Sequence, residues 1–301
     1  MSNPLSDHQA SPPEASLNRA EQYRLALAWR NEGGLADLQG FDLSRQDLRL
    51  VDLMDANLAG ANLAGANLTG AFLAGANLNG ANLSGARLED AGLEQAQLEQ
   101  ATLVQANLHQ AVLIRANLTG ANLSLANLVE AHLIGANLTQ TDLRLAQLSR
   151  ANLKGTNLAG ANLAGAVLIE ANLAGASLEG AKNLAGANME KAILARANLV
   201  QVNLAGAFLA EAFLAEANLT QANLAGAFLA KADLSRANLH QANLAGTFLA
   251  GATLHGVDLS AASLRGAVLA KANLREANLT GAELAGVVLT EAIMPDGTKY
   301  D

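Results

Sequence analysis

The stretch NLAGAFLAEAFLAEANLTQANLAGAFLAKADL, residues 203–234, decides the fold of this chain. A leucine returns every five residues within it, and an alanine usually stands two positions before each leucine. Two apolar residues at this spacing point to the same face of an extended strand. The remaining three-residue step must turn a corner and bring the next alanine back inside. The pattern therefore predicts a closed coil of very short strands, because the 3.6-residue period of a helix fits it poorly.

The five-residue unit, Ala-Asn-Leu-x-x, extends over most of the chain. It runs in one frame from Leu38 to Leu178 and in a second frame, displaced by one residue, to Met294, for 52 units in all. The slip lies within residues 181–184, and we interpret it as a β-bulge that ejects Lys182. A functional loop is the alternative, although one extra residue projects very little.

Composition agrees with a repeat architecture. The 301 residues are 51% hydrophobic but only 3% aromatic, which is too little bulk for a conventional globular core. The 27 glycines argue against a long helix or coiled coil, because each costs about 1 kcal/mol in a helix interior. A net charge of −8 argues against nucleic acid as a partner, and the absence of cysteine excludes disulfides and thiolate metal sites. The sequence has no signal-peptide core and no run of 18 apolar residues, so we expect a cytoplasmic protein without a membrane partner.

A longer period of 20 residues appears in the C-terminal half. The motif NLAGAFLAEAFL begins at Asn203, NLAGAFLAKADL at Asn223 and NLAGTFLAGATL at Asn243. Twenty residues correspond to four faces of five residues, so we expect a four-sided coil. The 52 units then make about 13 coils, or a rod about 60 Å long at the spacing of paired strands.

Tandem A(D/N)LXX units over residues 36–294 resemble the pentapeptide-repeat proteins, a bacterial family with many cyanobacterial members. The resemblance implies an all-β solenoid, a right-handed quadrilateral parallel β-helix, in which leucine and alanine point inward and the other three residues point outward. Proline is absent between Pro13 and Pro295, as a backbone hydrogen-bond ladder requires. Six larger residues that replace the inward alanine can still pack inside: Phe41, Val51, Thr141, Val202, Val257 and Val287.

The ends of such a solenoid need covers, because an open sheet edge invites polymerisation. We expect a disordered tail over residues 1–15, a capping helix over 16–34, the solenoid over 35–297 and a short tail over 298–301. Ser16 is the expected N-cap of the helix. Leu25, Ala28 and Trp29 share one helix face and are the expected lid on the first coil. A turn at residues 294–298 stops the ladder, and no second helix follows it.

Residues 20 apart should stack on the outside of the rod, where one column is apolar. We interpret this column as an interface and a homodimer as its most economical form; the alternative is that repeat duplication copied a harmless phenylalanine. Two charged columns lie beside it, and they either stabilise neighbouring coils or set the register of a dimer. The candidate interaction surface is Phe208, Phe228, Phe248, Val268 and Val288, with Phe213 on the adjacent face. The charged columns are Lys191, Glu211 and Lys231, and Arg196, Glu216 and Arg236.

No residue pattern indicates catalytic, cofactor-binding or metal-binding chemistry. The acidic cluster of Glu89, Asp90, Glu94 and Glu99 fits a solvated surface best. A non-catalytic protein-binding, scaffold or regulatory module with an unidentified protein partner is therefore the leading hypothesis. The family resemblance implies a second, a DNA mimic that protects DNA gyrase, but the chain lacks the C-terminal dimer helix of such members. The third is a peripheral envelope protein that binds through the phenylalanine column.

Overall fold

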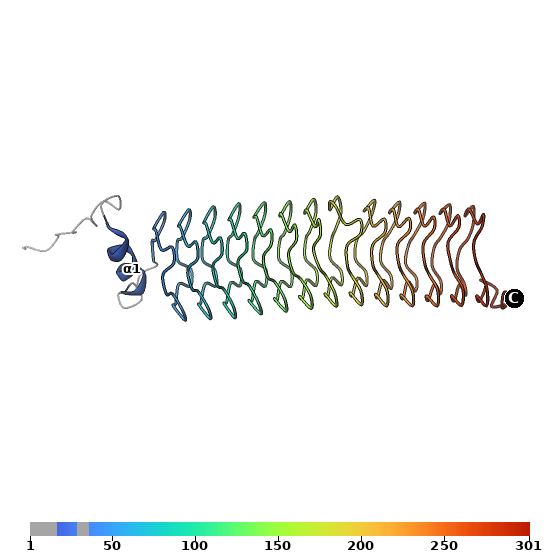
Figure 1. Cartoon of the computed structure of the whole chain (residues 1–301), viewed down its shortest axis with the longest axis horizontal. Helices are drawn as coiled ribbons and strands as arrows, with labels where there is room; N and C mark the ends of the chain where they lie inside the picture. The colour runs from blue at the N-terminus through green and yellow to red at the C-terminus, as the bar shows by residue number, and fades with distance from the viewer. Residues whose placement is uncertain (1–16, 29–35) are drawn as a thin grey trace, which may run out of the picture.

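The structure, a computed structural model, describes residues 17–28 and 36–301 and has the form of a long rod (Figure 1). One helix, α1 (Arg19–Ala28), precedes a series of nearly identical coils. Each coil pairs with the next through parallel single-residue bridges between positions 20 apart, such as Asp37 with Asn57 and Phe228 with Phe248. The predicted 20-residue period is confirmed by this register.

The Ala-Asn-Leu-x-x unit satisfies all five of its backbone N–H groups. Three donate to carbonyl groups of the neighbouring coils, the N–H of each following alanine donates to the leucine carbonyl of the same turn, and the residue after leucine donates to the asparagine side chain. In the unit at residues 57–61, these five donors are Asn57 to Ala36 O (2.7 Å), Leu58 to Asn77 O (2.7 Å), Ala59 to Asn57 Oδ1 (3.3 Å), Gly60 to Asn79 O (2.9 Å) and Ala61 to Leu58 O (3.0 Å).

Asparagine has a second structural task, because its side chains also bond between coils. The Nδ2 group of Asn243 donates to Oδ1 of Asn223, and Nδ2 of Asn223 donates to Oδ1 of Asn203, both at 3.0 Å. An aspartate can accept the turn bond but cannot donate along the column. The preference for asparagine before each leucine therefore follows from hydrogen bonding on the outside of the rod.

The interior of the rod is filled by stacked leucine and alanine side chains, as predicted. The core leucines from Leu38 to Leu274 are at most 2% exposed. Of the six larger inward residues, Val51 and Val287 are half-buried in the end coils and the other four are buried. Two further threonines at this position were not anticipated. The hydroxyl groups of all three buried threonines donate to leucine carbonyl oxygens: Thr141 to Leu118 (2.9 Å), Thr156 to Leu153 (2.8 Å) and Thr247 to Leu224 (3.0 Å).

Helix α1 begins two residues later than predicted. Its N-cap is Asn18, whose Oδ1 accepts the N–H of Glu21 (3.1 Å), while a Glu21 carboxylate oxygen accepts the N–H of Asn18 (2.8 Å). This reciprocal pair is a capping box. The assignment of the N-cap to Ser16 was therefore wrong, and Ser16 itself lies outside the described residues.

Helix α1 replaces part of a missing coil at the N-terminal end. The Gln22 side-chain oxygen accepts the N–H of Asp42 at 2.7 Å, whereas the equivalent N–H groups of Asn62 and Asn82 donate to carbonyls of the coil before them. The Tyr23 hydroxyl donates to the Asp47 carbonyl at 2.9 Å. Leu25 packs against the core, as predicted.

The other expected lid residues are placed differently. Ala28 is exposed, the buried residue of the helix is Ala26, and Trp29 lies outside the described residues. The spacing of Leu25 from Ala28 had put both on one face, but the helix meets the coil through Tyr23, Leu25 and Ala26.

The C-terminal end turns back on itself. Met294 N–H donates to Thr298 O (2.8 Å), and an antiparallel bridge joins Ile293 to Lys299. The predicted turn is therefore present, and the residues after Gly297 pair with the last face. The core positions of the last coil are still partly open, with Leu284 43% exposed.

The one-residue slip is a bulge, but Lys182 is not the ejected residue. Lys182 bridges Asn162 within the ladder, and its N–H donates to Ala161 O at 2.8 Å. Asn183 is the extra residue: it is exposed, its φ is +60°, and its side chain donates to Asn162 Oδ1 at 2.9 Å. Asparagine tolerates the left-handed region better than lysine, which is the physical reason for the correction.

Candidate interaction surface

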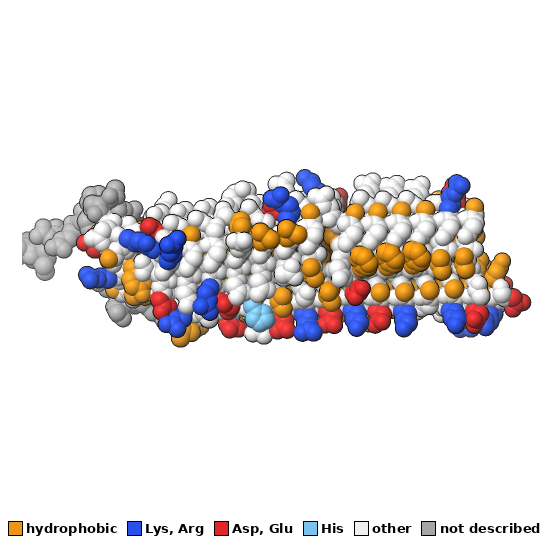
Figure 2. All heavy atoms as spheres, in the orientation of Figure 1, with side chains coloured by type: hydrophobic (Ala, Val, Ile, Leu, Met, Phe, Trp, Pro, Cys, Tyr) orange, Lys and Arg blue, Asp and Glu red, His pale blue; other side chains and the backbone are white. Residues whose placement is uncertain are grey.

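The predicted apolar column forms a continuous row on the outside of the C-terminal half, visible as an orange band in Figure 2. We call it the Phe stripe, defined as Phe208, Phe228, Phe248, Val268 and Val288, which are joined in this order by parallel bridges. Phe213 bridges Ile193 and Asp233, so it belongs to the next face of the rod and not to the stripe.

The three rings of the Phe stripe stack face to face. The centroids of Phe208 and Phe228 lie 5.1 Å apart with planes 6° apart, and those of Phe228 and Phe248 lie 5.1 Å apart with planes 2° apart. The residues are 41%, 39% and 43% exposed. Stacked aromatic pairs contribute about 0.5–1.5 kcal/mol beyond their area burial, but the outer surface of all three rings still faces solvent.

The Phe stripe occupies positions where asparagine would satisfy the backbone. Asn188, one coil before Phe208, accepts the N–H of Glu190 at 3.2 Å in the usual way. A phenylalanine in that place has no oxygen to offer, so it leaves the equivalent N–H to solvent and interrupts the side-chain column. Local backbone hydrogen bonding therefore gives no reason for these phenylalanines, and departures from a self-consistent pattern point to function.

The two edges of this face differ. On one side the corner positions are glycines, among them Gly206, Gly226 and Gly246, with φ of 64–65°. These glycine positions carry no side chain, and the residues before them in the turns are alanines with the exception of Arg265. We call this the glycine edge. On the other side the corner carries long charged residues in alternation, which appear as the blue and red row below the stripe in Figure 2.

The charged column at this edge is longer than the three residues that the sequence singled out. Arg150 bonds to Glu170 at 2.8 Å and lies 3.6 Å from Glu130, and Lys271 lies 3.8 Å from Glu291. We call the whole set the charged edge; the one-residue slip hides its continuity from a simple count of 20. From the N-terminal side the charged edge is Glu130, Arg150, Glu170, Lys191, Glu211, Lys231, Gly251, Lys271 and Glu291.

The second predicted column lies one corner further round the rod. Arg196 Nε donates to Glu216 at 2.8 Å, and this hydrogen bond, with the charge of Arg196, lowers the pKa of Glu216. Arg236 follows in the same column and acts on Glu216 through its charge. Exposed pairs of this kind contribute about 0–1 kcal/mol each.

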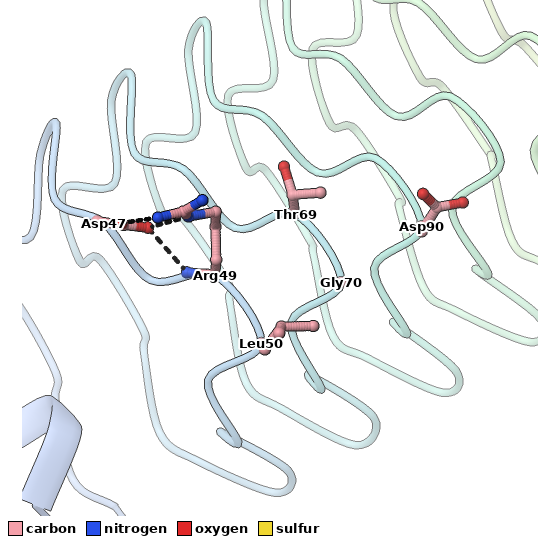
Figure 3. A pocket seen from close by; sticks show the side chains of 6 residues that line it. All are labelled: Asp47, Arg49, Leu50, Thr69, Gly70 and Asp90. Carbon is pink, nitrogen blue, oxygen red and sulfur yellow. Dashed lines mark hydrogen bonds and ion pairs between the residues drawn. The ribbon is translucent and has the colours of Figure 1, made fainter.

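Among the described residues, no hollow in the surface brings together side chains that could catalyse a reaction. Figure 3 shows a hollow near the N-terminal end in which the Leu50 side chain extends over Gly70, and Asp47 accepts two bonds from the Arg49 guanidinium at 2.8 and 2.6 Å. The Arg49 hydrogen bond lowers the pKa of Asp47. Nucleophile, base and acid groups do not converge there.

The carboxylates of the acidic cluster bond to different neighbouring side chains. Glu89 accepts from Thr69 (3.2 Å) and from Asn107 (2.8 Å), and Glu99 accepts from Asn117. Within residues 17–28 and 36–301, no group of three or more histidine or acidic side chains is close enough to hold a metal ion. No helix in that same part of the chain is long and apolar enough to cross a membrane.

A four-sided solenoid of tandem five-residue units, with coils in 20-residue register around a leucine and alanine core, defines the class of parallel β-solenoid repeat proteins. Family comparison gives the same result: the pentapeptide-repeat model matches residues 56–95 and 146–295 in overlapping segments, and a related pentapeptide-repeat region matches residues 86–163. The chain belongs to the pentapeptide-repeat family.

Solved structures of the same family resemble the chain. HetL, a protein involved in heterocyst differentiation regulation from the cyanobacterium Nostoc, is 30% identical, with 94% of this chain and all of HetL covered and a TM-score of 0.30. QnrB1, a plasmid-mediated fluoroquinolone resistance protein, is 20% identical over 52% of this chain and 81% of its own, with a TM-score of 0.47. Rfr23 from the cyanobacterium Cyanothece is 23% identical over 62% and 91%, with a TM-score of 0.16. No curated protein sequence matches the chain.

Proposed function

We propose that this chain is a non-catalytic protein-binding module that associates with a second copy of itself through the Phe stripe. The module is a rigid rod of about 13 coils, about 60 Å long at the spacing of paired strands, with α1 as its N-terminal cap. Self-association leaves the other faces free to hold further proteins in a scaffold or regulatory complex.

The observation that carries the proposal is the exposed stack of Phe208, Phe228 and Phe248, which interrupts a side-chain column that asparagine would complete. The residues around the stack are small. Ala210, Ala230, Ala250 and Ala270 follow core leucines on this face, and glycines form one corner. Two such faces can approach closely, and rigid aromatic groups on a flat apolar surface are typical of interface centres.

The two other functions expected from the sequence fit the surface less well. Duplex DNA carries about 35 charges over 60 Å. Residues 42–301 carry 22 acidic and 16 basic residues, a net charge of −6, and on the charged edge each acid alternates with a base. A peripheral envelope role would need basic residues around the Phe stripe to attract anionic lipid, whereas Lys191, Lys231 and Lys271 alternate with acids or glycine.

The experiment compares the mass of the wild-type protein in solution with that of Phe208→Asn/Phe228→Asn/Phe248→Asn, by light scattering over a range of concentrations. Asparagine is the residue that the repeat normally carries there, so the variant should fold. The matched control is Leu125→Asn/Leu145→Asn, which removes two exposed leucines that lie four and three coils before the first residue of the stripe.

We expect a concentration-dependent dimer for the wild type and the control, and a monomer for the triple variant. The Phe stripe should bury less area than a standard interface of about 1,600 Å², so the dimer should be reversible. A wild type that stays monomeric at every concentration contradicts the proposal, as does a triple variant that dimerises as well as the wild type.

A further inference from the structure

We propose that the self-association is antiparallel, with a two-fold axis that lies between the two rods, perpendicular to them, at the level midway between Phe228 and Phe248. This inference rests on the proposed function and adds the orientation and register of the two copies. It follows from two features together: the charges along one edge of the Phe stripe disfavour the alignments half a coil to either side, and a shift by a whole coil reduces the overlap of the two Phe stripes.

Two symmetric ways exist to place the Phe stripes of two copies face to face. If the rods run parallel, the charged edge of each copy lies against the glycine edge of the other. The lysines Lys191, Lys231 and Lys271 then face no acidic side chain there. If the rods run antiparallel, the two charged edges lie opposite each other wherever the rods overlap. The antiparallel arrangement is therefore the one in which Lys191, Glu211 and Lys271 can form ion pairs across the interface.

The register follows from counting coils, because a residue and its successor 20 positions on lie one coil apart. With the axis midway between Phe228 and Phe248, Phe228 faces the partner's Phe248, and Phe208 faces the partner's Val268. On the charged edge, Lys191 then faces the partner's Glu291, and Glu211 faces the partner's Lys271. Symmetry doubles these contacts to four ion pairs. Lys231 faces the partner's Gly251, which carries no charge.

Moving the axis by half a coil in either direction replaces attraction with repulsion. An axis through Phe228 places Lys231 opposite the partner's Lys231 and Lys191 opposite the partner's Lys271. An axis through Phe248 instead places Glu211 opposite the partner's Glu291, and Lys231 opposite the partner's Lys271. Opposed like charges select against these half-coil shifts. A shift by a whole coil toward the N-terminus pairs opposite charges again, but it places Phe248 opposite the partner's Asn188 and so loses apolar contact between the stripes.

The first test exchanges charges between chains. In Glu211→Lys alone, and in Lys271→Glu alone, two interchain pairs become repulsive, so each dimer should weaken about tenfold. When the two variants are mixed, Lys at position 211 faces Glu at 271 of the other chain and the remaining pair is unaltered. The mixed dimer should regain wild-type affinity, measured by sedimentation of one dye-labelled variant titrated with the other. Mixing leaves the intrachain contacts of each variant unchanged, so they cannot account for the recovery.

The second test is a cross-link in a chain that has no cysteine of its own. Positions 211 and 271 lie three coils apart within one chain, about 14 Å, beyond the reach of a disulfide. Glu211→Cys/Lys271→Cys should therefore oxidise to a covalent dimer. Glu216→Cys/Glu276→Cys has the same spacing on the next corner and serves as the control, which should stay uncross-linked.

One combination of results overturns the antiparallel register and leaves the proposed function standing. In it, the triple asparagine variant abolishes the dimer, mixing of the two charge variants restores no affinity, and both cysteine pairs cross-link equally. A protein that never dimerises, or a dimer that is insensitive to the asparagine variant, overturns both.

Discussion

The rings of Phe228 and Phe248 are parallel to within 2° and 5.1 Å apart, although 20 residues of chain separate them. One full coil lies between the two residues, so the distance between the rings reports the spacing of the coils. The same register relates residues 20 positions apart along the rod, or 21 positions apart across the slip. The residues of a surface column therefore recur at a regular spacing in the sequence. A substitution at one position of a column affects the residues at the same position in the preceding and following coils.

Replacing an asparagine of the side-chain column should destabilise the rod. Asn223 donates to Asn203, accepts from Asn243 and accepts the N–H of Ala225, at 3.0–3.2 Å. Asn223→Ala removes all three bonds at a partly exposed site, and we expect a loss of about 1–2 kcal/mol in the free energy of unfolding, measured in urea. Thr220→Ala, on the adjacent face, removes one side-chain bond, from the Thr220 hydroxyl to Asn218 Oδ1 at 2.6 Å. A loss for Asn223→Ala no larger than that for Thr220→Ala contradicts the role assigned to the column.

Adding a side chain to the glycine edge should block association without unfolding the protein. Gly226 has a φ of +64° and open space around an added Cβ, and Arg236 adopts a similar φ of +56° at another corner. Gly226→Arg should therefore cost about 1 kcal/mol of stability. The arginine projects beside Phe228 and should weaken the dimer at least tenfold in a light-scattering titration. Gly256→Arg, at a corner away from the stripe, should leave the dimer intact; equal weakening by both changes is the opposing result.

Removing the side-chain contacts of α1 should loosen the first coil. Gln22→Ala leaves the Asp42 N–H without its acceptor, and Tyr23→Phe removes the bond to the Asp47 carbonyl. Each change should cost about 1 kcal/mol locally. Hydrogen exchange of the Asp42 amide should become roughly fivefold faster in Gln22→Ala, while amides near residue 150 keep their protection. Unchanged exchange at Asp42 would show that the helix does not cap the coil.

Acid should weaken the rod. A hydrogen bond from Arg144 lowers the pKa of Asp142, and hydrogen bonds from Arg150 and Arg196 lower those of Glu170 and Glu216. A carboxyl with a lowered pKa in the folded state contributes stability that is complete above its unfolded pKa and is lost as the pH falls through the folded value. The contribution should therefore be complete above about pH 5 and decline below about pH 4.

Urea unfolding at pH 7 and pH 3 measures this acid effect. The variant Asp142→Asn/Glu170→Gln/Glu216→Gln should lose less stability between the two values than the wild type does. An equal loss in both proteins would mean that these three carboxyl groups do not contribute.

The repeat made most of the fold predictable, because a leucine every five residues and a motif every 20 leave few closed arrangements. The errors arose where two residues matched the same pattern. Lys182 and Asn183 both fit the slip, and the left-handed φ decides for Asn183. Ser16 and Asn18 are both good N-caps, and the spacing from Asn18 to Glu21, typical of a capping box, was the overlooked indicator.

The outer surface was predictable in part. The Phe stripe could be found by counting in steps of 20, and the structure adds the stacking of its rings and the glycine edge beside it. The full charged edge was missed because Glu130, Arg150 and Glu170 lie before the slip, where the count must change by one. No local motif in the sequence identifies the partner, which we propose to be a second copy of this chain.

The most direct test of the account is the distance between spin labels on the two copies of Ser149→Cys, measured by double electron–electron resonance. Ser149 lies on the same face as the Phe stripe, and no native cysteine competes for the label. The antiparallel dimer separates the two labels by nine coils, or about 45 Å at the spacing of paired strands. Parallel rods would place them within about 20 Å, and end-to-end contact of the open C-terminal coils would place them about 70 Å apart. A main distance near 45 Å is the predicted result, and either of the others contradicts the account.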